Sequence, residues 1–153
     1  MAEGVRLRAA TAQDGDRLRE WRNDPELVAS TFSEHPVEAD EHRSWLERVL
    51  ADSDERMLVA EADGEPVGQV RLQARGEGEV EVHIGLASHA RGRGLGTLVL
   101  ELAAERAADD AAARSLVARV RADNERSLRA FAAAGFRERT REASEVVLER
   151  RLG

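Results

Sequence analysis

The chain lacks three residue types that carry much of enzyme chemistry. Cysteine and tyrosine are absent from its 153 residues, and all 23 basic residues are arginine. Without cysteine there is no disulfide, thiolate nucleophile or thiolate metal site, and without lysine there is no Schiff base or Walker-type phosphate site. Groups that donate or accept protons are therefore limited to carboxyls, four histidines, hydroxyls and water.

The chain also lacks long apolar runs and an excess of basic charge. Its first residues show no apolar core of a signal peptide, and no segment reaches the roughly 18 apolar residues of a membrane span. The formal net charge of −7 argues against a general nucleic-acid-binding protein, which needs a basic surface. We therefore expect one folded domain over residues 1–153, cytoplasmic, with no nucleic-acid or membrane partner.

Hydrophobic periodicity predicts a mixed α/β fold of the α+β type. It predicts a first strand at 5–9, a helix after Thr11 and another helix from Glu38 to Leu50. Asp63-Gly64 predicts a β-hairpin, because both residues tolerate the positive φ angles of a type I′ turn. The further expected elements are strands at 80–86, 116–120 and 146–148 and helices at 94–109 and 124–134. This order predicts a central, mostly antiparallel sheet with about four helices packed on both faces.

A glycine-rich loop stands between the predicted strand 80–86 and the predicted helix 94–109. It reads Arg91-Gly92-Arg93-Gly94-Leu95-Gly96, and its glycines let the backbone approach a ligand while the helix start attracts an anion. A dinucleotide-binding fingerprint needs glycine at the next position, where Thr97 stands, and a βαβ unit in place of the preceding meander. The loop therefore predicts a phosphate site outside a Rossmann fold. A glycine-rich helix entry with two solvated arginines is the alternative.

Two motifs in the second half resemble a known enzyme family. The glycine loop resembles the Q/R-x-x-G-x-G/A motif of the GNAT superfamily of acetyl-CoA-dependent N-acetyltransferases. The segment from Asn124 through Ser127 and Phe131 to Gly135-Phe136 resembles the family pattern N-x-x-S-x-x-x-Y-x-x-x-G-F. The expected order of elements matches that fold along nearly the whole chain. The resemblance implies a single N-acetyltransferase domain over residues 1–153.

A narrower resemblance lies in the first half. Trp21-Arg22-Asn23-Asp24-Pro25, Phe32 and Glu41-His42-Arg43-Ser44-Trp45 are similar to the acetyltransferases that act on the 4-amino group of a UDP-linked amino sugar in pseudaminic acid synthesis. Ribosomal-protein N-terminal acetyltransferases are the nearest competing group. The expected acceptor is therefore a nucleotide-linked amino sugar or a similar small amine, with a protein N-terminus as the alternative.

The family resemblance implies direct transfer of acetyl from acetyl-CoA to an amine, without a metal. Backbone amides of residues 91–96 would hold the pyrophosphate, and the strand near Gly85 would hydrogen-bond the pantetheine arm and thioester. The cofactor-binding residues implied in this way are Ile84, Gly85, Leu86, Arg91, Gly92, Arg93, Gly94, Leu95, Gly96, Thr97, Asn124, Ser127 and Phe131. For Asn124, the ordinary role of a helix N-cap is the alternative.

Phe131 departs from the family pattern. It stands where the family often has a tyrosine that protonates the departing thiolate, and phenylalanine cannot donate a proton. Water or another group then supplies the proton, or the thiolate leaves unprotonated, or the domain is a non-catalytic acyl-CoA-binding sensor. The sequence leaves these alternatives open.

Glu81 and His83 are the candidate catalytic residues. The attacking amine must lose a proton, and a carboxylate or an imidazole is suited to accept it. Both side chains fall on one face of the predicted strand, opposite Val82 and Ile84. The alternative is a solvated strand face with a cross-strand ion pair.

Arg22, Asn23 and His42 are the candidate acceptor-binding residues. All three belong to the segments that carry the narrower resemblance. The alternative for Arg22 and Asn23 is an exposed helix end before a proline turn, and the alternative for His42 is a helix surface. The expected partner is a small amine, and the sequence leaves a homodimer open.

Overall fold

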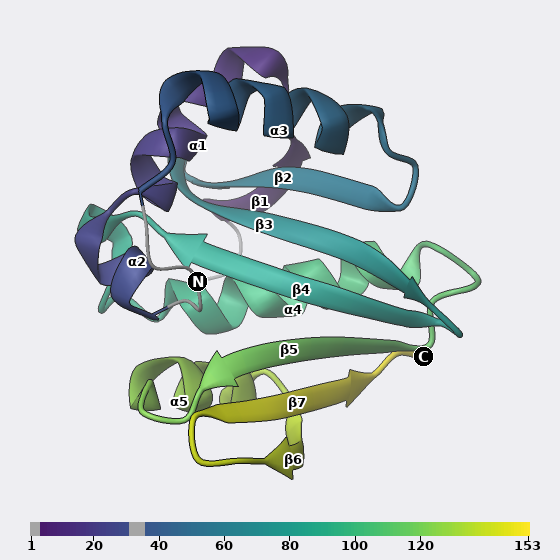
Figure 1. The fold of residues 1–153 in the computed structure, drawn as a ribbon. Helices are drawn as coiled ribbons and strands as arrows, with labels where there is room; N and C mark the ends of the chain where they lie inside the picture. The colour runs from purple at the N-terminus through teal and green to yellow at the C-terminus, as the bar shows by residue number, and fades with distance from the viewer. Residues whose placement is uncertain (1–3, 31–35) are drawn as a thin grey trace.

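The computed structural model describes residues 4–30 and 36–153 (Figure 1). Phe32, part of the narrower resemblance, lies outside these ranges. The described strands are β1 (Val5–Ala9), β2 (Glu55–Ala62), β3 (Glu65–Gly76), β4 (Glu79–Leu86), β5 (Ser115–Arg121), β6 (Arg137–Arg141) and β7 (Glu145–Arg151). The described helices are α1 (Gly15–Arg22), α2 (Pro25–Ser30), α3 (Ala39–Ala51), α4 (Leu95–Ala108) and α5 (Glu125–Ala133), with 3-10 turns η2 (Ala12–Asp14) and η3 (Ser88–Ala90).

All the described strands form one sheet in the order β1-β2-β3-β4-β5-β7-β6. Neighbouring strands are antiparallel except β4 and β5, which run parallel. That parallel pairing is short, because it joins residues 79–81 to residues 115–117 and then stops. Beyond Glu81 the two strands diverge, and Figure 1 shows them opening toward the side where α2 and α5 lie. The predicted mixed α/β fold with a mostly antiparallel central sheet is confirmed.

Helices cover the two faces of the sheet unequally. The larger apolar core lies between the sheet and α4 and α5, and its fully buried members include Leu100 and Leu116. A smaller core joins β2 to α1 and α3 on the opposite face, around Leu18 and Leu46. On this second face, β5 and β7 have no described helix in front of them in Figure 1, and α2 reaches β4 near Gly85, toward the C-terminal end of that strand. The sheet thus has a packed face and a face that is partly open.

The residues of β4 alternate between these two faces, as their sequence predicts. Val82 is buried in the larger core, and Ile84 packs against the same core. Glu81 and His83 lie on the opposite face, where Glu81 meets Arg75 of β3. The pairing of β4 with β3 is regular along this segment, so no bulge exchanges the two faces.

Local sequence explains why the hairpin between β2 and β3 is predicted and why β6 is not. Asp63 and Gly64, with φ angles of +51° and +83°, form the two-residue turn between β2 and β3, which confirms the predicted hairpin. The sequence does not predict β6. All five residues of β6 are exposed, so the strand lacks the apolar alternation by which a half-buried strand is found.

Candidate active site

The glycine loop leads into α4 near the end of β4. Gly92 and Gly94 have φ angles of +77° and +74°, in the left-handed region that favours glycine. A Cβ on Gly96 would lie 3.7 Å from Ala130 Cβ of α5 and 3.8 Å from Leu86 Cδ1 of β4. The start of α4 therefore lies against both α5 and β4. Its first-turn N–H groups have no partner within the helix, which suits this position to an anion such as a pyrophosphate.

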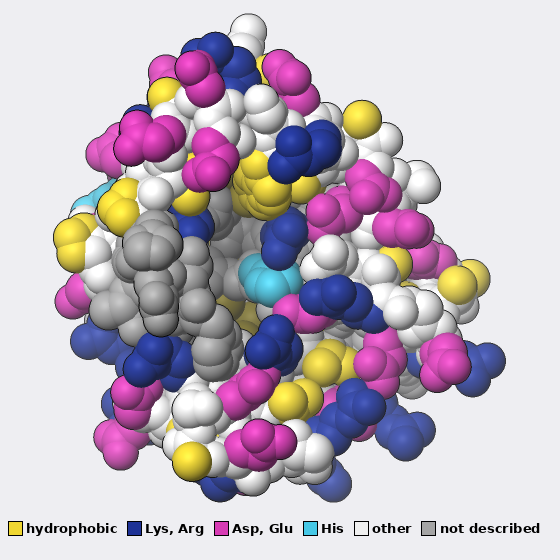
Figure 2. All heavy atoms as spheres, viewed as in Figure 1, with side chains coloured by type: hydrophobic (Ala, Val, Ile, Leu, Met, Phe, Trp, Pro, Cys, Tyr) yellow, Lys and Arg dark blue, Asp and Glu magenta, His cyan; other side chains and the backbone are white. Residues whose placement is uncertain are grey.

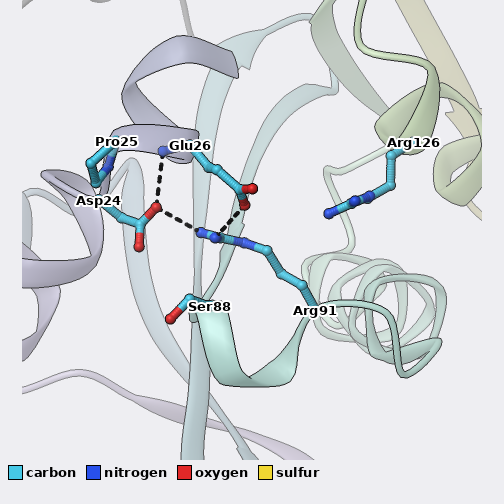
Figure 3. Close-up of a pocket in the computed structure, with 6 residues that line it drawn as sticks. All are labelled: Asp24, Pro25, Glu26, Ser88, Arg91 and Arg126. Carbon is cyan, nitrogen blue, oxygen red and sulfur yellow. Dashed lines mark hydrogen bonds and ion pairs between the residues drawn. The ribbon is translucent and has the colours of Figure 1, made fainter.

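The two arginines of the loop differ in their surroundings. Arg91 reaches α2, with Nη1 2.6 Å from Glu26 Oε2 and Nη2 3.3 Å from Asp24 Oδ1 (Figure 3). Arg93 is exposed and has no ion pair in the part of the chain that the structure describes. In this structure, the Arg91 side chain therefore binds carboxylates of α2 and its N-terminal boundary, whereas Arg93 is open to an anion.

A cavity of about 410 Å³ lies beside Arg91. Figure 3 shows Arg126 of α5 extending toward it from the side opposite α2. The cavity is lined by Asp24, Pro25, Glu26, Ser88, Arg91 and Arg126. It joins the start of α2, the glycine loop and the start of α5, which are three segments that the sequence places far apart.

Asn124, Ser127 and Phe131 contribute to the structure of α5. Asn124 Oδ1 accepts a hydrogen bond from the Ser127 N–H at 3.2 Å, so Asn124 is the N-cap of α5, as its alternative role predicts. Phe131 is buried in the larger core, and its ring meets the Phe136 ring edge-on at a centroid distance of 4.9 Å. Cofactor contact by these three residues stays a prediction.

Glu81 and His83 lie side by side and form a cluster with Arg75. Glu81 Oε1 accepts a hydrogen bond from Arg75 Nε at 2.8 Å, and Glu81 Oε2 lies 3.0 Å from His83 Nε2, close enough for an ion pair but without the alignment of a hydrogen bond. Glu81 is 6% exposed. The proximity of His83, aided by Arg75, lowers the pKa of Glu81 to about 2, although burial acts to raise it. Such a carboxylate is a weak base, and it is better suited to orienting His83.

His83 leaves its second ring nitrogen accessible. Nε2 is buried against Glu81, whereas Nδ1 has no partner among the described residues and is not a buried atom. With the proton on Nε2, facing the carboxylate, the lone pair of Nδ1 can accept a proton. In Figure 2, arginine, carboxylate and apolar side chains gather around a recess near the middle of this face. The geometry therefore favours His83 over Glu81 as the base.

Two of the three predicted acceptor residues, Asn23 and His42, take part in packing, and their contact with an acceptor stays a prediction. Asn23 Nδ2 donates to the Val37 carbonyl at 2.9 Å, and Asn23 Oδ1 accepts from the Val37 N–H at 2.7 Å, so the amide fastens Val37 to the end of α1. His42 is buried, with 4% of its surface exposed. Burial, and then the charges of Arg19 and Arg22 on α1, lower the pKa of His42. Contact of Arg22 with the acceptor stays a prediction.

Sequence reasoning missed two neighbours of the candidate site. Arg75 stands six positions before Glu81 and lies where the pairing of β3 with β4 shifts register, between Ala74 and Gly76. Leu27 of α2 packs on β4, since a Cβ on Gly85 would lie 3.1 Å and 3.2 Å from its two Cδ atoms. The one available signal was that a buried carboxylate needs a cation, and the sequence offers many arginines for that role.

Comparison with known proteins identifies the family and similar folds. A model described as the acetyltransferase (GNAT) domain matches residues 5–137, and the chain belongs to this family. Spermidine N-acetyltransferase from Vibrio cholerae, in complex with CoA and spermine, has a TM-score of 0.87 at 19% identity, over 97% of this chain and 95% of that chain. Aminoglycoside acetyltransferase AAC(6′)-Ib, in complex with coenzyme A and kanamycin, has a TM-score of 0.82 at 21% identity, over 96% and 94%. A search of curated proteins gave no match.

Family membership makes the chain an acetyl-CoA-dependent N-acetyltransferase that acts on an amine. The structural neighbours are aminoglycoside and spermidine acetyltransferases, so the narrower resemblance to the amino-sugar and ribosomal-protein groups is not shown. Over residues 4–30 and 36–153, no helix has the length and apolar character needed to cross a membrane. The same residues contain no group of three His, Asp or Glu side chains placed to hold a metal ion.

Proposed function

We propose that the chain acetylates the primary amine of a small acceptor, with His83 as the general base. One observation carries this proposal: the pairing of β4 with β5 ends at Glu81, two residues before His83. From Val82 to Leu86, β4 has no described strand on that side, and its backbone polar groups need partners. The amide groups of a pantetheine arm are suited to pair with them, which would bring the thioester close to His83.

The predicted cofactor residues support this position. The start of α4 and the glycine loop offer N–H groups and Arg93 to the pyrophosphate, at the end of β4 where the arm would leave the sheet. The backbone of Ile84, Gly85 and Leu86 would line the arm, and its N–H groups would stabilise the oxyanion that develops on the thioester.

The proposed reaction needs one proton acceptor on the chain. The amine nitrogen attacks the thioester carbonyl, an N–C bond forms as the C–S bond breaks, and the amine proton passes to His83 Nδ1. Glu81 stays ionised at neutral pH, because its pKa is about 2, and its charge would stabilise the imidazolium. The thiolate takes its proton from water, since Phe131 cannot donate one and the sequence has no tyrosine.

We propose a nucleotide-linked amino sugar as the preferred acceptor. Glu81, the carboxylate beside His83, is paired with Arg75, and Glu145 of β7 and Glu55 of β2 are paired with Arg119 and Arg71. A polycation would therefore find little unpaired negative charge. Arg75 is 48% exposed whereas its partner Glu81 is 8% exposed, so a diphosphate can still reach the guanidinium. Spermine and kanamycin, which the structural neighbours bind, are the competing acceptors, together with a peptide N-terminus.

Mass analysis of products tests both parts of the proposal. The protein is incubated with acetyl-CoA and, separately, with a UDP-linked 4-amino sugar, spermine, kanamycin and a peptide with a free N-terminus. Acetylation of the sugar at the highest kcat/KM supports the preferred acceptor, and a higher value for another amine overturns it. If the protein binds coenzyme A but forms no product, the result would support a non-catalytic acyl-CoA-binding sensor. A cytoplasmic location and one domain over residues 1–153 stay part of the proposal, and a homodimer is left to measurement.

A further inference from the structure

Arg91 belongs to the loop that the family resemblance assigns to the cofactor, but its guanidinium is directed toward α2. Figure 3 shows it between Asp24 and Glu26, the two carboxylates that it contacts. The Arg91 side chain is only 16% exposed, and the Asp24 side chain is 23% exposed. The Glu26 side chain is 68% exposed, so the guanidinium of Arg91 makes one partly buried ionic contact, with Asp24, and one at the surface, with Glu26.

The carboxylates that hold Arg91 also define the start of α2. The Glu26 N–H donates to Asp24 Oδ1 at 3.0 Å, so Asp24 binds both the backbone of α2 and Arg91. Asn23, the preceding residue, is fastened to Val37 by two hydrogen bonds. Arg91 thus connects the glycine loop to a segment that is otherwise anchored to α1.

This segment reaches the face of β4 that carries the base. Leu27, next to Glu26, packs on Gly85, which is two residues from His83 and on the same face of the strand. A displacement of α2 would therefore change the space next to His83. Gly85 has no side chain that could keep Leu27 at a fixed distance from β4. The position of Leu27 therefore depends on the contacts that hold α2 in place.

We propose that Arg91 is a positioning residue for the acceptor site and not a ligand of the coenzyme A phosphates. The inference rests on the proposed function, because it takes the face with His83 as the acceptor site. Moving the guanidinium to a phosphate would break its contacts with Asp24 and Glu26 and release α2. The loop N–H groups and the exposed Arg93 provide the pyrophosphate with other partners.

Two variants separate the two roles of Arg91. Arg91→Gln removes the cation, and the double variant Asp24→Asn with Glu26→Gln removes its partners while leaving the cation free for a phosphate. Arg93→Gln, in the same loop, is the matched control. For each variant we would measure hydrogen exchange in the peptide covering residues 24–27, coenzyme A affinity by calorimetry, and KM for the UDP-linked amino sugar, or for spermine if that is the amine acetylated.

We expect Arg91→Gln and the double variant to behave alike. Each should raise exchange in the 24–27 peptide and the acceptor KM by about threefold to tenfold, with coenzyme A affinity within about twofold of the wild type. Arg93→Gln should weaken coenzyme A binding and leave exchange in 24–27 unchanged. A loss of about tenfold or more in coenzyme A affinity for Arg91→Gln, or unchanged exchange in both variants, would overturn the inference.

A failure of the proposed function can be told apart from a failure of the inference on Arg91, because the two have different readouts. If the wild type acetylates no amine of the panel, the transferase assignment and its acceptor fail, because product formation is their readout. Exchange in the 24–27 peptide and coenzyme A affinity do not depend on turnover. They would still decide whether Arg91 holds α2 or binds a phosphate.

Discussion

The two faces of β4 have opposite chemistry, although their residues alternate along one strand. On the face toward α4, Val82 is buried in the larger apolar core and Ile84 packs against it. On the other face, Glu81 and His83 form an ionic cluster with Arg75 of the neighbouring strand. Packing of the apolar face fixes the position of the strand. This in turn fixes the positions of Glu81 and His83 on the polar face. Substitutions on the polar face should therefore lower turnover, and substitutions on the apolar face should lower stability.

The largest effect is expected on the polar face, from His83→Gln. Glutamine has no basic nitrogen, so kcat/KM should fall by about 10²–10⁴-fold at neutral pH, and by less at high pH where the free amine is abundant. The free energy of unfolding should change by less than about 1 kcal/mol, because His83 is outside the core. The exposed His89→Gln is the control. A loss below about threefold would show that the acceptor arrives already deprotonated.

On the apolar face, Leu116→Ala should reduce stability and leave the chemistry alone. Leu116 is fully buried in β5, and its truncation should lower the free energy of unfolding by about 2–5 kcal/mol, through lost burial and a residual cavity. Urea unfolding measures this, and kcat of the folded fraction should stay close to the wild type. Leu50→Ala, at a residue 40% exposed, should cost less than about 0.5 kcal/mol. Equal costs at the two positions would contradict the described core.

Glu81→Gln tests the partner of the base and should have an intermediate effect. Turnover should fall by about 10-fold to 100-fold, because Gln cannot stabilise the imidazolium. The pKa of Glu81 is lowered to about 2 from an ordinary 4.5, so its ionised form stabilises the folded state above about pH 4.5. That contribution is lost as the pH falls through 2.

Urea unfolding measured between about pH 7 and pH 2 tests whether the stabilisation by Glu81 is lost as the pH falls. The stability difference between wild type and Glu81→Gln should shrink as the pH falls from about 4.5 to 2. Glu101→Gln, at an exposed position of α4, is the matched control and should show no such window. A stability difference that grew as the pH fell would contradict the depressed pKa.

The smallest effect is expected from Phe131→Tyr. The ring is buried in the core against Phe136, and a thiolate is a fair leaving group without an acid, so turnover should change by less than about tenfold. Steady-state kinetics at saturating acetyl-CoA measure it. A gain of about 10²-fold would instead show that the departing sulfur lacks a proton donor in the wild type.

The features that could be predicted from the sequence depend on neighbours in the chain. The turn at Asp63-Gly64 and the alternation of β4 are of this kind, and so are the two family motifs. The local pattern also predicts that Glu81 and His83 lie on one face of the strand. It could not rank them as bases, because the low pKa of Glu81 depends on its contact with His83 and on Arg75 from another strand.

The rest of the site depends on contacts that sequence spacing does not reveal. Arg91 and Glu26 are 65 positions apart, and nothing local indicates that the glycine loop meets α2. His42 follows a helical pattern that fits either an exposed or a buried position, and burial against α1 decides between them. Asn23 has the composition of a turn residue, but its amide has a specific partner in Val37.

The described ion pairs around the site all take their permanent cation from arginine, and the sequence contains no lysine. A lysine in their place would present a primary amine near an activated thioester, and its acetylation would remove the charge. A guanidinium stays protonated and is a poor nucleophile at any working pH. The cations that hold Glu81, Glu26 and Glu145 are therefore inert toward acetyl-CoA, and the site cannot be modified at these side chains by the reaction that it promotes.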